Sequence, residues 1–160
     1  MTRDFIRQNE ASRAQLSELI GRLDERAFEY AVGNGWKIAT LLCHLAFWDQ
    51  RTLFLLREWQ AGHFEVIRIS AQATNSINEA TKAVSRAVPG SAAGQLALES
   101  ASLVDAELER ISDELIEQIA SNGFERLLNR SLHRLEHLRK IEEALRLSPS
   151  AGATGPAFPS

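Results

Sequence analysis

The hydrophobic and polar positions of the chain follow a helical period over most of its length. Leucine, isoleucine and phenylalanine recur three and four residues apart, with arginine and glutamate between them. This spacing indicates amphipathic helices whose apolar faces meet in a shared core. The pattern predicts four long helices, over about residues 3–23, 37–60, 92–111 and 124–147.

Glycine, proline and asparagine mark the ends of these helices. The run Gly-Asn-Gly at 33–35 separates the first two, because neither residue type favours a helix interior. Ser76 and Glu79 have the spacing of a capping box, so we expect a shorter helix from about Ser76 to Pro89. Residues 63–69 partly alternate between apolar and polar. They have no partner strand, and we expect a connecting loop there.

Long helices, short connections and no strand pair predict an all-α fold, an antiparallel four-helix bundle. We expect this bundle to form one domain over residues 1–147. Residues 148–160 hold three of the four prolines and no charged residue. Such a segment buries little apolar surface, so we expect a disordered C-terminal tail.

Length and charge narrow the class of protein. A chain of 160 residues can bury a substantial core in one domain but is too short for two. Its net charge of −3 gives no basic excess toward phosphate backbones, which disfavours a nucleic-acid-binding protein. The single cysteine, Cys43, excludes an internal disulfide framework. With no targeting signal and no apolar run long enough to span a bilayer, we expect a soluble cytoplasmic protein without a membrane partner.

Three of the four histidines are candidate metal ligands. His133 and His137 lie four residues apart on the last predicted helix, so their side chains project within about 40° of each other. Two imidazoles at this spacing can share a divalent metal, and two ordinary surface histidines have the same spacing. They lie beside the apolar stripe of that helix, either in a cleft at its edge or in solvent.

His44 lies within the apolar stretch 41–48. A buried imidazole there needs a polar partner, which is either an ordinary core contact or a metal shared with the other two histidines. Three histidines with one open coordination position are typical of a catalytic metal site.

A family resemblance is carried by Trp36, by the run His44-Leu45-Ala46-Phe47-Trp48-Asp49, and by the pair His133-x-x-x-His137. In order and spacing these motifs resemble the DinB-like superfamily. That superfamily includes the N-terminal domains of mycothiol-dependent maleylpyruvate isomerases and the bacillithiol transferases. The resemblance extends to about residue 147 and implies a four-helix bundle in up-down-down-up order.

The same resemblance implies that His44, His133 and His137 ligate one divalent metal, zinc or nickel. It further implies a small-molecule substrate and a low-molecular-weight thiol as cosubstrate, activated as thiolate beside an electrophile. The function it favours is a metal-dependent thiol S-transferase, isomerase or hydrolase, with catalytic groups beyond the ligands unassigned. The alternative is a non-enzymatic module that binds a small molecule or a protein and retains a vestigial metal site.

Several polar residues near these motifs have two interpretations. Asp49 follows His44 by five residues and points to another side of the helix, so it is either solvated or orients a ligand imidazole. Three arginines of the last helix region form either a solvated charged face or a group that attracts an anionic substrate. These are Arg130, Arg134 and Arg139.

The tryptophans and the apolar flank of the second helix complete the expectations. Trp36 and Trp48 are expected in the core or, by the resemblance, as walls of the metal cleft. Leu55, Leu56 and Phe64 are apolar flank residues compatible with a homodimer.

Overall fold

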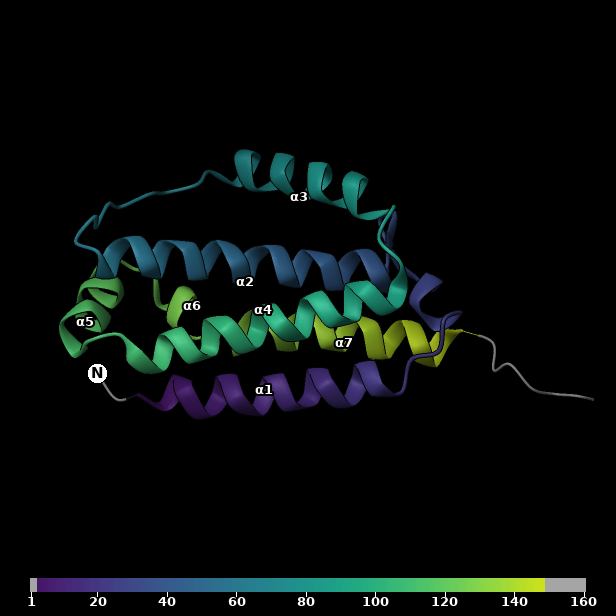
Figure 1. The fold of residues 1–160 in the computed structure, drawn as a ribbon. Coiled ribbons are helices and arrows are strands. Elements are labelled where there is room, and N and C mark those ends of the chain that lie inside the picture. The colour runs from purple at the N-terminus through teal and green to yellow at the C-terminus, as the bar shows by residue number, and fades with distance from the viewer. Residues whose placement is uncertain (1–2, 149–160) are drawn as a thin grey trace, which may run out of the picture.

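Four long helices lie side by side in the computed structural model, which describes residues 3–148 (Figure 1). α1 and α7 run in one direction and α2 and α4 in the other, which is the up-down-down-up order. The expectation of an all-α fold is confirmed. Of the tail expected over residues 148–160, residues 149–160 lie outside the described residues. The helices are α1 (Asp4–Gly21), α2 (Ile38–Gln60), α4 (Gly90–Arg110) and α7 (Ser131–Leu147).

The connection between α2 and α4 explains why these two helices are parallel. A helix-free and strand-free segment at 63–70 leads into α3 (Ala71–Ser85), which returns the chain along the outside of α2 (Figure 1). α3 begins earlier than expected. Its N-terminal cap is the hydroxyl of Ser70, which accepts a hydrogen bond from the backbone N–H of Ala73 at 3.1 Å, so the capping box predicted at Ser76 is wrong.

A small hairpin joins α1 to α2, where no strand pair was expected. After the 3₁₀ turn η1 (Ala27–Glu29), β1 (Ala31–Gly33) pairs antiparallel with β2 (Trp36–Lys37). Gly33, Asn34 and Gly35 all have positive φ, at 106°, 50° and 74°, which explains the two glycines in this turn. Strands of two or three residues are too short to produce a recognisable alternation in the sequence.

The chain between α4 and α7 also differs from the expectation. A single helix was predicted over 124–147, whereas the structure has α6 (Glu125–Leu128), then a break at Asn129 and Arg130, and then α7. Before α6, the structure has a further short helix, α5 (Asp113–Ser121), capped by the Ser112 hydroxyl. Among residues 3–148, no helix is long and apolar enough to cross a membrane.

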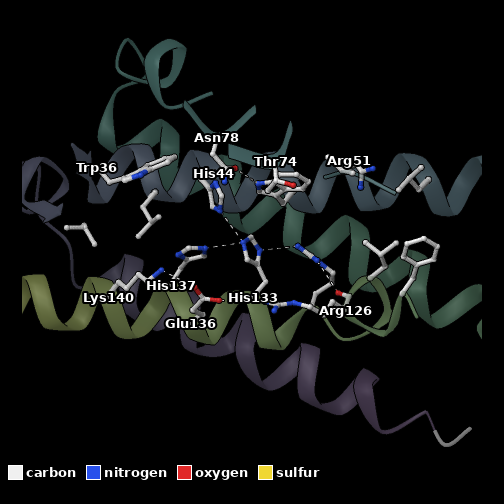
Figure 2. A pocket seen from close by; sticks show the side chains of 18 of the residues that line it. Trp36, His44, Arg51, Thr74, Asn78, Arg126, His133, Glu136, His137 and Lys140 are labelled. Atoms are coloured by element: carbon white, nitrogen blue, oxygen red, sulfur yellow. Dashed lines mark hydrogen bonds and ion pairs between the residues drawn. The ribbon is translucent and has the colours of Figure 1, made fainter. Parts of the chain in front are cut away.

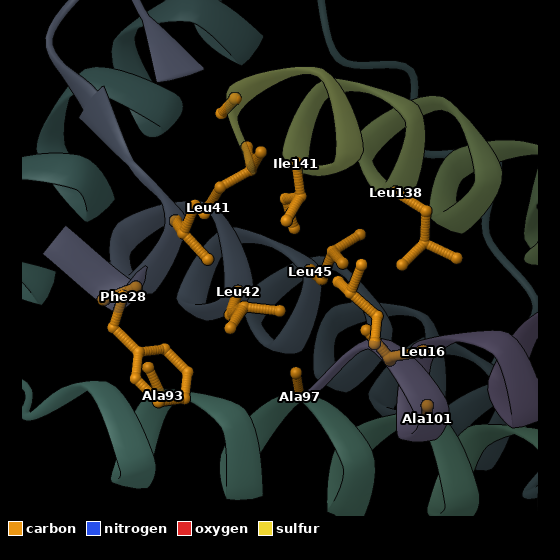
Figure 3. Close-up of a cluster of buried hydrophobic side chains, with 14 residues drawn as sticks. Leu16, Phe28, Leu41, Leu42, Leu45, Ala93, Ala97, Ala101, Leu138 and Ile141 are labelled. Atoms are coloured by element: carbon orange, nitrogen blue, oxygen red, sulfur yellow. The ribbon is translucent and has the colours of Figure 1, made fainter. Parts of the chain in front are cut away.

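The core lies between the four long helices (Figure 3). Alanines on one face of α4 leave room for the leucines of α2, so these two helices pack closely along their length. Leu55 and Leu56, expected on an exposed flank, are instead buried in a second cluster toward the α5 end. Phe64 is half-buried against Trp59. The main cluster includes Leu16, Leu42, Leu45, Ala93, Ala97, Ala101 and Ile141.

Candidate metal centre

Three histidines from two helices meet in the structure (Figure 2). The Nε2 atom of His133 lies 3.1 Å from Nε2 of His44 and 3.1 Å from Nε2 of His137. One ring nitrogen of each lies within 4.8 Å of the others, so the group could hold a metal ion. The expected convergence of α2 and the last helix at these residues is therefore present in the fold.

The three imidazoles are withdrawn from solvent. His44 and His137 are buried and His133 is half-buried, so the cleft interpretation of the last helix is correct and the solvated one is wrong. The rings of Trp36 and His44 pack edge to face with centroids 5.3 Å apart, and the centroids of His44 and His137 are 4.8 Å apart. Packing therefore sets the orientation of these rings.

Burial keeps all three rings neutral. Loss of hydration lowers the pKa of His44 to about 4 and that of His137 to about 3, with smaller contributions from neighbouring cations and rings. Burial and then the nearby Arg130 guanidinium lower the pKa of His133 well below its ordinary value. A neutral imidazole carries one ring-nitrogen lone pair, which is the form that ligates metals.

The spacing of the nitrogens suits a single transition-metal ion. Two nitrogens that each lie about 2.1 Å from one ion are about 3.4 Å apart at a tetrahedral angle and about 3.0 Å apart at a right angle. Two of the three separations, from Nε2 of His133 to Nε2 of His44 and of His137, are 3.1 Å and fall between these values, and all three ligand atoms lie within 4.8 Å of one another. Imidazole donors suit zinc, nickel, copper and iron, so the donor set fits a divalent ion without selecting one.

The Nδ1 atoms of the three imidazoles differ in their hydrogen-bond partners. Within residues 3–148, Nδ1 of His44 and Nδ1 of His137 are buried and have no hydrogen-bond partner. Nδ1 of His133 instead lies 3.1 Å from Nη2 of Arg130. Because a guanidinium only donates, this Nδ1 accepts, and the neutral ring then carries its proton on Nε2, toward the other two histidines. For Nε2 of His133 to bind a metal, the proton of the neutral ring must lie on Nδ1 instead. The Arg130 contact and metal ligation by a neutral His133 therefore exclude each other.

A network of buried arginine and aspartate side chains lies beside the histidine triad. Arg130 Nε donates to Asp49 Oδ1 at 2.7 Å, and Arg134 Nη2 donates to Asp49 Oδ2 at 3.1 Å and to Asp105 Oδ1 at 2.8 Å. Arg13 of α1 closes the network on Asp105 at 2.9 Å. All four long helices are thus joined at the level of the histidines.

This network corrects two expectations. Arg134 is fully buried, with 0% of its surface exposed, and Arg130 is buried too, so neither belongs to a solvated charged face. Arg139 is exposed, which agrees with the interpretation of a solvated charged face for this residue. Asp49 is buried rather than solvated and reaches His133 through Arg130, which makes it an orienting carboxylate one step removed from the ring.

The triad forms part of the wall of a pocket of about 770 Å³. One face of α2 supplies His44, Trp48, Arg51 and Trp59, at helical spacing, while α6 and α7 form the opposite wall. α3 contributes to the wall as well, where Trp48 Nε1 donates to Asn78 Oδ1 at 3.0 Å. The tryptophans are thus walls of the cleft, as the resemblance implied.

The other candidates, His63 and Cys43, lie outside the histidine triad. One residue that lines the pocket, Arg51, was not predicted. His63 is exposed and faces Glu58 at 3.3 Å, and burial raises the pKa of the Cys43 thiol, which favours its protonated form. Arg51 was not singled out from the sequence. Its position seven residues after His44, on the same helix face, was the available signal.

Comparison with known proteins agrees with the fold and with the resemblance. The family model described as DinB superfamily matches residues 8–148 and therefore includes all three histidines. No curated protein and no solved structure matches the chain.

Proposed function

The chain belongs to the DinB superfamily, and from that premise we propose that it is a metal-dependent enzyme acting on a small molecule, of the thiol S-transferase, isomerase or hydrolase type. The observation that carries the proposal is the convergence of three neutral Nε2 atoms at the wall of a large pocket. A purely structural histidine cluster would not need a ligand-sized space beside it. We also propose a cytoplasmic setting, in which low-molecular-weight thiols are reduced.

His44, His133 and His137 would hold the divalent ion, zinc or nickel by the resemblance. Bound there, the ion would act as a Lewis acid that lowers the pKa of a thiol or water. The chain's own contribution is a set of three imidazoles oriented by packing against Trp36 and against one another. Trp36 and Trp48 line the pocket beside His44, with ring centroids 5.3 Å and 6.3 Å from its ring, and would limit the access of water there.

A cobalt-substituted protein tests the thiol part of the proposal. The chain is loaded with Co(II) and titrated with 2-mercaptoethanol, with ethylene glycol as the matched oxygen compound. We expect a thiolate-to-cobalt charge-transfer absorption with the thiol alone. The His133→Ala/His137→Ala variant should give no such band. A protein that binds cobalt but shows no band with the thiol would contradict thiol activation and leave the hydrolase type.

A second candidate is the non-enzymatic module that binds a small molecule without metal. The observation that favours it is the Arg130 contact to Nδ1 of His133, which supplies the tautomer of a metal-free hydrogen-bonded cluster. Under this alternative the protein would remain free of metal after dialysis against zinc or nickel, and removal of the histidines would leave ligand binding unchanged.

A further inference from the structure

The pocket wall contains a cation with no counterion. Arg51 lies on α2 and is half-buried, and no carboxylate or carbonyl of residues 3–148 accepts a hydrogen bond from it. Its guanidinium carbon instead lies 5.6 Å from the centroid of the Trp48 ring. Burial and the charge of Arg130 lower its pKa, although a guanidinium stays protonated at neutral pH.

The other charged groups of the wall are already paired. Arg130 donates to Asp49 at 2.7 Å, and Lys140 donates to Glu136 at 2.9 Å. Arg126 lies 3.6 Å from Glu136. Within the described residues, Arg51 is therefore the charged group of this wall that has no oppositely charged partner.

The position of Arg51 relative to the histidines is fixed by α2. Arg51 follows His44 by seven residues, which is two helical turns, or about 10 Å along the axis. The same face carries Trp48 between them and Leu55 and Trp59 beyond. Figure 2 shows Arg51 displaced from His44 along α2, on the side away from Trp36. Along α2 the wall therefore carries His44 of the triad, then the aromatic ring of Trp48, and then the cationic Arg51.

We propose that Arg51 anchors a carboxylate of the pocket's ligand. The ligand class is an acid with an apolar body, whose other end reaches the histidines about 10 Å away. One free planar guanidinium matches the two oxygens of a carboxylate, and the low polarity of the neighbouring rings strengthens the pair. The claim that the other end of this ligand reacts at the histidines rests on the proposed function. The carboxylate anchor holds with or without a metal.

Calorimetry on metal-stripped full-length protein tests the anchor with two matched probes, 4-phenylbutanoate and its uncharged amide, 4-phenylbutanamide. A hydrogen bond to a charged partner corresponds to about 10- to 100-fold in affinity, so we expect the acid to bind more tightly than the amide by that factor. Arg51→Gln should abolish this preference and leave the affinity for the amide unchanged. Arg51→Lys, which keeps the charge but not the planar fork, should retain part of the preference.

Arg57→Gln is the control, because Arg57 is on the same helix but is exposed and paired with Glu107 at 3.2 Å. It should keep the full preference for the acid. The inference is overturned if wild type binds both probes equally or neither, or if folded Arg51→Gln, verified by circular dichroism, still prefers the acid. Because no metal is present, these outcomes are independent of whether the histidines bind one.

Discussion

Replacing Arg130 with glutamine should tighten metal binding, which is the opposite of the usual effect of altering a residue beside a metal ligand. The Arg130 guanidinium donates to Nδ1 of His133 at 3.1 Å and holds the proton of that ring on Nε2. Ligation by the neutral ring must break this contact. A glutamine can turn its carbonyl oxygen toward the ring and accept a hydrogen bond from Nδ1–H, which leaves the lone pair of Nε2 free to ligate.

The magnitude follows from the lost contact. A hydrogen bond with a charged partner contributes about 1.5–3 kcal/mol, so releasing it before ligation should raise the affinity about 10- to 100-fold in Arg130→Gln. Asp49 keeps its second partner, Arg134, at 3.1 Å, and the fold should therefore survive. Zinc affinity is measured by competition with a chromophoric chelator.

Arg126→Gln separates the hydrogen bond from general electrostatics. Arg126 lines the same pocket and carries the same charge, and no contact joins it to the His133 ring among the described residues. Its replacement should change the affinity much less than Arg130→Gln does. An Arg130→Gln protein that is folded but binds zinc no more tightly than Arg126→Gln would refute the tautomer argument.

Three further predictions concern the fold around the site. Arg134→Met should destabilise the protein by about 3–5 kcal/mol in urea unfolding, because it leaves two buried aspartates each short of one partner; a loss below about 1 kcal/mol would contradict this. In the metal-free protein, His44 and His137 stay neutral down to about pH 4 and about pH 3, whereas the unfolded chain takes up protons below about pH 6.5. Stability should therefore fall from pH 6.5 toward pH 4, by up to about 1.4 kcal/mol per pH unit for each histidine, and the His44→Gln/His137→Gln variant should show a flatter profile in the same assay. Gly90→Ala should cost about 1–3 kcal/mol, measured as a lower urea midpoint, because its Cβ would lie 2.4 Å from Phe28 side-chain atoms; an unchanged midpoint would show that this ring has room to move.

The pair His133 and His137 could be predicted from the sequence because its spacing is local, at i, i+4 on one helix face. His44 is 89 residues from His133, and its place in the triad followed from the motifs that resemble the DinB-like superfamily. The helical periods also located the four long helices. The short hairpin and the break before α7 involve too few residues to leave a periodic signal.

The buried network could not be predicted as a whole, because its members come from helices far apart in the sequence. Asp49 and Arg134 are 85 residues apart, and a single helix does not show what a crossing helix brings to it. One signal was present. On a wheel with Leu128 at zero, Arg134 lies at about 240°, inside the apolar stripe between Ile141 and Leu138. A charge inside an apolar stripe indicates a buried partner, and here there are two.

Metal content tests the central claim most directly. The protein is purified without a polyhistidine tag, dialysed against zinc and separately against nickel, and analysed by elemental mass spectrometry. We predict about one equivalent in wild type and in a His63→Ala control, and none in His133→Ala/His137→Ala, since three nitrogens from one site hold one ion. A folded wild type without metal, or equal metal in the double variant, would contradict the assignment of the triad as a metal centre.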